Sequence, residues 1–329
     1  MRQSAVCAPL RSGGCAFFLH RRIVESNPSR GELDRVDSTD CARGLIVRQE
    51  QAYVASLRFR SRHKIRSTPA EVGRRVGWHP GAMNYTASEL MVAAAAREIR
   101  DGDVVFVGMR LPLIAFVVAK KTHAPGAVGV FENGILRDAP ARELLYTMSD
   151  GPNITGALSC LSMLECMALL QRGRVSLGFL GAAEVDRHGN LNSTEGRKAD
   201  GGLTRLPGSG GACDIAALSQ RFVALLDHQK FRLPERVQYI TSPGHGPWRQ
   251  GRLARGGPAA VITTRAVLRF SAQGVAYLDS HHPGTSIEEV LAHTGWALDV
   301  SPKVHETPPP SAAELRAIRA YDRKGFWTR

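Results

Sequence analysis

The sequence predicts an α/β fold with a mainly parallel sheet flanked by helices. Short, continuously apolar runs such as Val104–Gly108 are typical of strands that are covered on both faces. These runs alternate along the chain with segments of helical pattern, as strand–helix–strand units require. Hydrophobic residues make up 43% of the 329 residues, which is enough for a full core. No apolar run reaches the roughly 18 residues of a membrane span, so we expect no membrane partner.

Residues 1–82 differ from the rest in charge and pattern. They contain 15 Lys and Arg but only 7 Asp and Glu, so most of the net charge of +13 lies there. Their apolar residues have no sustained period, and Cys15–Leu19 is too short for the core of a secretion signal. We predict a folded domain at 83–329, beginning near Met83. Residues 1–82 are then either a poorly ordered basic extension or the product of a start codon assigned too early.

The charge and the cysteines exclude two classes of function. The basic residues of the first quarter form no helical stripe and have no interleaved aromatics, so we expect no nucleic-acid partner. The cysteines form no C-x-x-C pair and no zinc-like spacing with histidine, so we expect no metal. Reduced thiols in a cytoplasmic protein are the simplest interpretation. The six cysteines are Cys7, Cys15, Cys41, Cys160, Cys166 and Cys213.

The first half of the domain begins with a well-marked helix. Thr86 and Glu89 have the spacing of a capping box, and an alanine-rich stretch continues to about Arg100. Pro112 falls in the first turn of a second helix, where its missing N–H costs nothing. The predicted elements that follow the first helix are a strand at 104–108, a helix at 111–121 and a strand at 128–131.

The second half continues the alternation. Ile154–Leu170 is long and apolar and predicts one buried helix, in which Met163, Met167, Cys160 and Cys166 pack in the core rather than hold a cofactor. The remaining predicted elements are strands at 175–180, 222–226, 237–240 and 259–263, a hairpin of 267–270 with 275–278, and helices at 286–293 and 312–321, the last capped by Ser311.

Two further segments concentrate polar side chains. A predicted strand ends at Asp186, and His188 and Asn190 follow within a short loop that we interpret as a turn network. His281 and His282 would point to opposite sides of a strand, which argues against a shared metal.

A single carboxylate stands at the end of one predicted strand. The apolar run that begins at Val128 stops at Glu132, and Asn133 and Gly134 follow as a strong turn dipeptide. A solvated glutamate is the simpler interpretation of a strand end. The alternative is a carboxylate that the turn directs at a reacting group.

A glycine loop lies between two later elements. Gly208, Gly210 and Gly211 free the backbone to present N–H groups to an anion or a developing oxyanion, and a helical stretch follows Ala212. A plain loop that needs positive φ explains the same glycines. The spacing matches neither a dinucleotide fingerprint nor a P-loop, and Ser209 lacks the G-x-S-x-G context of a hydrolase nucleophile.

Four segments appear in one order. Together they resemble the β subunit of family I coenzyme A transferases, and most closely the glutaconate CoA-transferase type, and the resemblance runs from about Met83 to about Asp322. The resemblance implies the α/β fold of these enzymes, which is NagB/RpiA-like. The segments are "GMRLPL" (108–113), "FENG" (131–134), "GAAEVDRHGNLNST" (181–194) and "RLPGSGGA" (205–212).

The resemblance assigns roles to residues of this sequence. Glu132 is implied to be the nucleophile of a ping-pong reaction through a glutamyl-CoA thioester, and Asn133 and Gly134 shape its turn. The loop near the thioester would provide coenzyme A contacts and oxyanion donors; it contains Gly208, Gly210, Gly211 and Ala212. An acyl-CoA is then a substrate, with no permanently bound cofactor and no metal.

The family also implies a partner. Its site lies between an α and a β subunit, so we expect an α subunit and an α2β2 assembly. Arg110 stands where a second glycine is usual, and Phe131 replaces a frequent serine. A ring-opening acyl-CoA hydrolase and a non-catalytic CoA-binding subunit remain alternatives, and the acyl group can be dicarboxylic, 3-oxo or steroid-derived.

Overall fold

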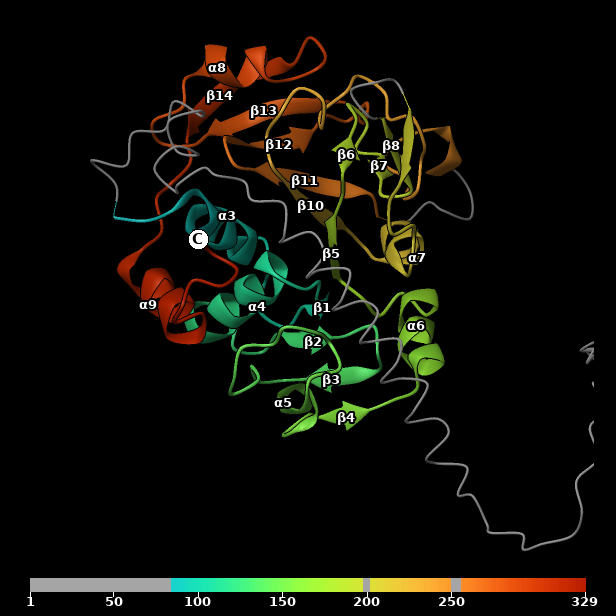
Figure 1. Ribbon diagram of the computed structural model, residues 1–329, viewed down its shortest axis with the longest axis vertical. Coiled ribbons are helices and arrows are strands. Elements are labelled where there is room, and N and C mark those ends of the chain that lie inside the picture. Colours follow the sequence, from blue (N-terminus) through green and yellow to red (C-terminus); the bar gives the residue numbers. More distant parts are fainter. Residues whose placement is uncertain (1–83, 198–201, 250–255) are drawn as a thin grey trace, which may run out of the picture. The chain divides into compact units, whose positions relative to one another are not determined.

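The computed structural model describes residues 84–197, 202–249 and 256–329. The predicted N-terminal extension, 1–82, lies outside the described residues, as do Cys7, Cys15 and Cys41. The described part contains a ten-stranded sheet with helices on both faces (Figure 1), which confirms the predicted α/β class. The strand order is β14-β13-β12-β11-β10-β5-β1-β2-β3-β4. No described helix is both long and apolar enough to cross a membrane.

The five central strands are parallel. In spatial order they are β2 (Val128–Val130), β1 (Val104–Phe106), β5 (Leu177–Gly181), β10 (Phe222–Leu226) and β11 (Pro258–Thr263). Nearly all of their residues are buried, as expected for strands covered on both faces. Because they are parallel, their carboxyl ends lie at one edge of the sheet.

Antiparallel pairs extend the sheet at both sides. β3 (Ile135–Arg137) pairs with β2, and β4 (Ser159–Cys160) pairs with β3. On the other side, β12 (Ala266–Phe270) and β13 (Ala276–His281) form the predicted hairpin. β14 (Asp299–Glu306) adds a parallel strand beyond β13. β3, β4 and β14 are short or largely exposed and were not predicted.

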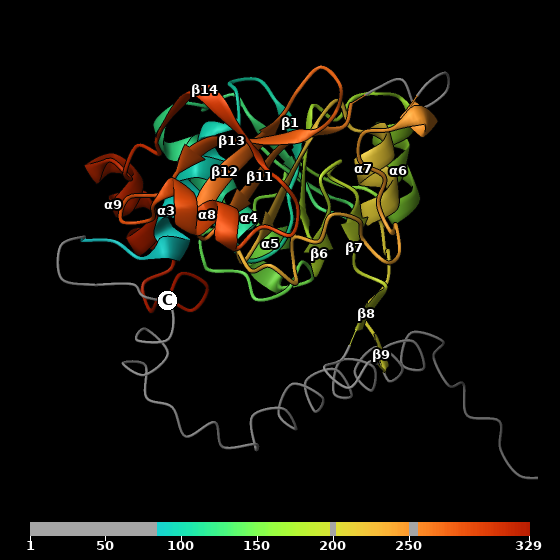
Figure 2. The ribbon, with the colours of Figure 1, turned by 90° about the horizontal axis from the view of Figure 1, so that it is seen from above.

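The helices divide between the two faces of the sheet. α3 (Ala87–Arg97), α4 (Leu111–Thr122) and α9 (Ala312–Tyr321) pack together on one face. α6 (Met163–Gln171) and α7 (Ala212–Leu218) lie side by side on the other (Figures 1 and 2). The remaining described elements are α5 (Gly151–Ile154), α8 (Ile287–Ala292), β6 (Glu184–Val185), β7 (Leu191–Asn192), β8 (Glu195–Arg197), β9 (Leu203–Arg205) and η1 (Pro247–Arg249).

Alternate residues of one strand enter different cores. Val105 packs with the α3, α4 and α9 side, whereas Phe106 packs with the α6 and α7 side. This is the period of two that a strand imposes, seen here with apolar residues at every position. Thr86 and Glu89 form the predicted capping box of α3, with a Glu89 N–H to Thr86 Oγ1 distance of 3.1 Å.

The predicted helix at 154–170 is wrong. The chain forms the end of α5, then β4, and α6 begins only after Ser162, which makes a capping box with Glu165. Gly156, at φ 71, interrupts the helical path. Of the four side chains predicted to lie in the core, Cys166 is buried and Met167 packs against the core, whereas Met163 is 61% exposed and Cys160 is exposed too.

The predicted strand at 237–240 is also absent. The backbone there pairs with no strand, and Tyr239 and Ile240 are exposed. The Val237 N–H points to the carboxylate of Asp186, at 3.4 Å, instead of a neighbouring strand.

Candidate active site

Glu132 lies at the tip of the hairpin that joins β2 to β3. The Phe131 N–H donates to Ile135 O at 2.8 Å, and the Gly134 N–H donates to Phe131 O at 2.9 Å. Glu132 is thus the second residue after β2, at the edge where the parallel strands end. The turn predicted from the Asn-Gly dipeptide is present, although the second strand of its hairpin was not predicted.

Gly134 cannot be replaced without a change in this turn. Its φ is +99, and an added Cβ would lie 2.0 Å from the carbonyl oxygen of Leu161. The chain comes this close because the Leu161 N–H donates to Gly134 O at 2.9 Å. The glycine therefore ties the hairpin tip to the segment that leads into α6.

Asn133 fixes the other side of the turn. Its Nδ2 donates to Met148 O at 2.7 Å, the same carbonyl that accepts Asn153 Nδ2 at 2.8 Å. Asn133 Oδ1 is buried and has no hydrogen-bond partner among the described residues. The side chain of Asn133 therefore connects the turn to the loop before α5.

Cys166, in α6, contacts the backbone of the turn. Its thiol is fully buried and donates to Phe131 O at 3.2 Å. Burial, with a further contribution from the negative charge of Glu132, raises the pKa of this thiol to about 11. Because thiolate is the reactive form, Cys166 is a structural side chain and a poor nucleophile at neutral pH.

The glycine loop meets Glu132 from a distant part of the chain. The Gly211 N–H donates to Glu132 Oε1 at 3.0 Å across a separation of 79 residues. α7, which begins at Ala212, leads back to the start of β10, so its first turn lies at the edge where β2 ends. A Cβ on Gly211 would lie 2.9 Å from this carboxylate oxygen, so the backbone approaches Glu132 as closely as a glycine permits.

The other residues of the loop shape it. The Gly208 N–H donates to Ser193 O at 2.8 Å, and the Ala212 N–H donates to Ser209 O at 2.9 Å. Within the described part of the chain, the Gly210 N–H has no acceptor. Four residues were predicted to line the thioester. Of these, only Gly210 and Gly211 have N–H groups that are not used in backbone hydrogen bonds of the described residues, and the Gly211 N–H reaches Glu132.

The Asp186 segment holds the loop in place. The Asp186 carboxylate is buried and accepts the N–H groups of His188 and Asn190, each at 3.0 Å. This is the predicted turn network. The same segment continues to Ser193, whose hydroxyl donates to Gly208 O at 2.9 Å. The motif thus positions the glycine loop, a role that its residue composition did not reveal.

Arg110 has an unusual backbone conformation at the same edge. Its φ of 69 and ψ of −123 make it the one non-glycine residue with positive φ in the described ranges. Such a conformation costs a residue with a Cβ about 1–3 kcal/mol. The guanidinium carbon lies 5.5 Å from the ring centroid of Trp327. Trp327 was not predicted as a site residue, because it lies beyond Asp322, near which the resemblance ends.

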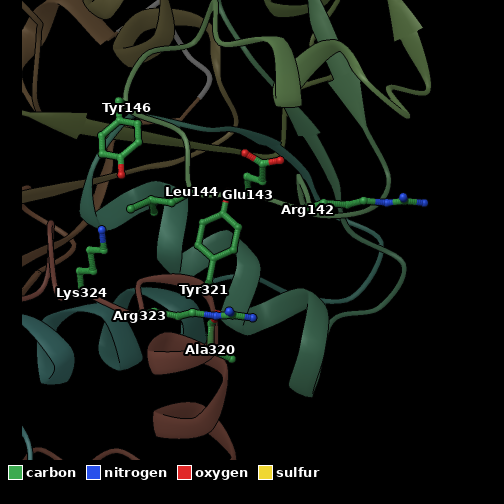
Figure 3. A pocket seen from close by; sticks show the side chains of 8 residues that line it. All are labelled: Arg142, Glu143, Leu144, Tyr146, Ala320, Tyr321, Arg323 and Lys324. Carbon is green, nitrogen blue, oxygen red and sulfur yellow. The ribbon is translucent and has the colours of Figure 1, made fainter.

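The described residues also form a cavity of about 320 Å³ that Glu132 does not line (Figure 3). Its charged side chains diverge: Arg142 and Arg323 extend to one side, and Lys324 lies on the other. None of the predicted site residues lines it, and the described residues contain no cluster of three or more metal-ligating side chains. The lining residues are Arg142, Glu143, Leu144, Tyr146, Ala320, Tyr321, Arg323 and Lys324.

Comparison with known proteins assigns a family to this architecture. Residues 88–293 match the family model of coenzyme A transferase. The B subunit of 3-oxoadipate CoA-transferase from Pseudomonas knackmussii is 36% identical over 72% of this chain and 94% of the relative. The B subunit of glutaconate CoA-transferase from Acidaminococcus fermentans is 33% identical over 72% of this chain and 92% of the relative.

Solved structures agree with the sequence comparison. The crystal structure of the glutaconate enzyme from Acidaminococcus fermentans matches 75% of this chain and 98% of its own, with a TM-score of 0.68 and 31% identity. The decarboxylase AibA/AibB matches 74% of this chain and 97% of its own, with a TM-score of 0.64 and 31% identity. The family model, the two relatives and the fold lead to one conclusion: this chain belongs to the coenzyme A transferase family.

Proposed function

We propose that this chain is the β subunit of an acyl-CoA:carboxylate CoA-transferase that works through a glutamyl-CoA thioester on Glu132. One observation carries the proposal: the Glu132 carboxylate stands on a built turn and meets the Gly211 N–H at 3.0 Å. The turn is held by Asn133, Gly134 and Cys166, so the position of the carboxylate is fixed before any substrate binds. Fixed geometry of this kind favours a nucleophile.

The first half of the reaction exchanges two bonds. The Glu132 carboxylate attacks the thioester carbonyl, and the C–S bond breaks to give a mixed anhydride and the coenzyme A thiolate. The thiolate then attacks the glutamyl carbonyl of the anhydride. The first carboxylic acid leaves as its carboxylate, and Glu132 remains as a thioester of coenzyme A. A second carboxylate reverses these steps and leaves as the new acyl-CoA.

Each attack creates a tetrahedral intermediate with a negatively charged oxygen. The N–H groups of Gly210 and Gly211 lie in the loop that contacts Glu132 and could stabilise this charge. Removal of one such donor typically lowers the rate by about 10²–10³. Neither step needs a metal or a resident cofactor, because coenzyme A is itself part of the substrate.

The partner of this chain is an α subunit in an α2β2 assembly. The two sequence relatives described above are both B subunits, which supports a second type of subunit. Next to the Glu132 turn, the segment 154–164 exposes large apolar side chains, as a partner interface does. These are Ile154 (52% exposed), Leu158 (57%), Met163 (61%) and Leu164 (79%). The α subunit would cover this surface and exclude water from the thioester.

The free thiols support a cytoplasmic location. Cys160, Cys166 and Cys213 are free in the described part of the chain. Free thiols are typical of a reducing compartment, so we place the enzyme in the cytoplasm.

Replacement of Glu132 by glutamine tests the proposal. The amide keeps the shape of the side chain but has no nucleophilic carboxylate, so we expect CoA transfer to fall by at least roughly 10³-fold. The measurement is acyl exchange between an acyl-CoA and a labelled carboxylic acid, with the complex purified together with its α subunit. Full transfer activity in an assembled Glu132→Gln complex would exclude the proposed intermediate.

The decarboxylase AibA/AibB gives a second candidate reaction for the same fold. A hydrolase is a third, since water could replace the acceptor acid. The three reactions differ in their products: a transferase needs the acceptor and makes a new acyl-CoA, a hydrolase releases coenzyme A without it, and a decarboxylase releases CO₂. The relatives' names, 3-oxoadipate and glutaconate, make these two acids the first acceptors to test.

A further inference from the structure

Arg110 adopts a conformation that suits glycine. Its φ of 69 with ψ of −123 is strained for any residue with a Cβ, and no other non-glycine residue in the described ranges has positive φ. The strain lies immediately before α4, which begins at Leu111 without a side-chain cap. Strain of this kind persists where the surroundings fix it, and it is concentrated at ligand sites.

Arg110 and Glu132 lie at the same edge of the sheet. They follow β1 and β2, which are parallel neighbours with Phe106 opposite Val130. The two chains still run together after β1 ends, because the Val107 N–H donates to Val130 O at 2.8 Å. Arg110 and Glu132 therefore leave the sheet from the same ends of neighbouring strands, which lie about 4.8 Å apart.

The guanidinium of Arg110 is exposed and has no carboxylate partner among the described residues. Arg221 and Arg319, by contrast, pair with Asp103 and Glu89. Arg110 instead lies over Trp327, 5.5 Å from the ring centroid. A ring orients a guanidinium through a cation–π contact but leaves its charge and its N–H fork available.

Trp327 is itself held firmly. Its Nε1 donates to Leu145 O at 3.1 Å, and its backbone N–H donates to the buried carboxylate of Asp322 at 2.8 Å. The ring of Phe326 packs against it edge-on, with centroids 4.5 Å apart. The C-terminal segment thus provides a fixed platform for the guanidinium beside the strand ends.

We infer that Arg110 binds the distal carboxylate of the transferred acyl group and so selects dicarboxylic acyl-CoA substrates. The inference rests on the proposed function, because it places the reacting carbonyl at Glu132. A planar guanidinium pairs with a carboxylate through two parallel N–H···O bonds, and no acidic side chain of the described residues occupies that pairing site on Arg110. The substrate carboxylate neutralises a charge that the described part of the chain does not pair.

The test compares two substrates that differ only in the distal carboxylate. Adipyl-CoA and hexanoyl-CoA, with acetate as the acceptor, are assayed with the complex of the chain and its α subunit. In Arg110→Gly we expect kcat/KM for adipyl-CoA to fall roughly 10–100-fold, the size of a charge-assisted pair. The hexanoyl-CoA value stays unchanged. Arg110→Lys, which keeps the charge but not the fork, gives an intermediate loss.

A matched control removes a charge from the far end of the same helix. Lys121→Gln in α4 alters neither substrate's kcat/KM, since Lys121 is exposed at the opposite end. Arg110→Gly also relieves the strained φ, so we expect the melting temperature of this variant not to fall. An unchanged melting temperature shows that a loss of activity is not caused by misfolding. An equal loss for both substrates, or no loss for adipyl-CoA, overturns the inference. Transfer that survives in Glu132→Gln instead overturns the proposed function.

Discussion

At the scale of single residues, the site depends on the lack of a side chain at Gly211. Gly211 has φ −79, a value that any residue adopts, so its glycine is explained by space rather than by backbone freedom. An added Cβ would lie 2.9 Å from Glu132 Oε1 and 3.1 Å from Glu132 Cδ. Contacts this short force the carboxylate to move. The glycine therefore sets where the proposed nucleophile stands.

Gly211→Ala accordingly separates the placement of Glu132 from the stability of the fold. The alanine displaces the carboxylate and its hydrogen bond, so we expect kcat to fall about 10²-fold. The melting temperature changes little, because the backbone needs no new conformation. Gly151→Ala is the matched control, since a Cβ there meets nothing within 4 Å. Unchanged turnover in Gly211→Ala would show that the Gly211 contact has no role in the reaction.

Residue types identified both partners of this contact from the sequence, but not the contact itself. The turn dipeptide after Glu132 and the run of loop glycines are local signals, and both were visible in the sequence. The hydrogen bond between Glu132 and Gly211 spans 79 residues, and no local pattern encodes it. The same holds for the contact between Arg110 and Trp327, because neither the positive φ of Arg110 nor its distant ring partner can be inferred from the sequence.

At the scale of elements, the segment 154–164 shows how composition can mislead. Its apolar residues resemble those of a buried helix, yet four of them form an exposed surface beside the hairpin tip. The sequence did contain the signal for the true helix start, because Ser162 and Glu165 have capping-box spacing. An apolar run cannot distinguish a core from an interface that a second chain covers.

A charge placed on that surface tests its role. Leu164 is 79% exposed, so Leu164→Glu should leave the fold of this chain intact but prevent it from burying the patch against the α subunit. We expect loss of co-purification with the α subunit and loss of activity together. Phe231→Glu, at a residue that is 66% exposed elsewhere, is the control and keeps the complex. A Leu164→Glu chain that still co-purifies would place the interface on another surface.

At the scale of the whole molecule, two buried histidines link stability to pH. His228 and His282 both hydrogen-bond Thr263, one to its hydroxyl at 2.8 Å and the other to its carbonyl at 2.8 Å. Burial, with the charge of Arg265, lowers the pKa of His228 to about 3, and burial lowers the pKa of His282 to about 4. Below about pH 6.5 the unfolded chain binds protons that the folded chain rejects.

The free energy of unfolding therefore falls as the pH drops from about 6.5 towards 4, by up to about 1.4 kcal/mol per pH unit for each histidine. His282→Gln removes one of the two groups, so its stability should depend less steeply on pH across this window. Urea unfolding midpoints between these pH values measure the slope. His305→Gln, at an exposed position, keeps the slope of the parent protein. Identical slopes for His282→Gln and the parent would contradict the assignment.

The class of the fold was predictable because its central strands are apolar at every position and its helices have clear caps. The outer strands β3, β4 and β14 were not, since short or exposed strands have no distinctive pattern. Only the folded structure shows that β1 and β2 end, and α7 begins, at one common edge of the sheet.

The covalent state of Glu132 during turnover tests the central claim most directly. The complex is incubated with acyl-CoA in the absence of an acceptor, treated with borohydride and digested with trypsin, and the peptide 122–137 is sequenced by mass spectrometry. A glutamyl thioester would be reduced, so we predict a Glu132 side chain converted to the alcohol only when acyl-CoA and borohydride are both present. An unmodified Glu132 in a complex that is fully active in transfer would contradict the account.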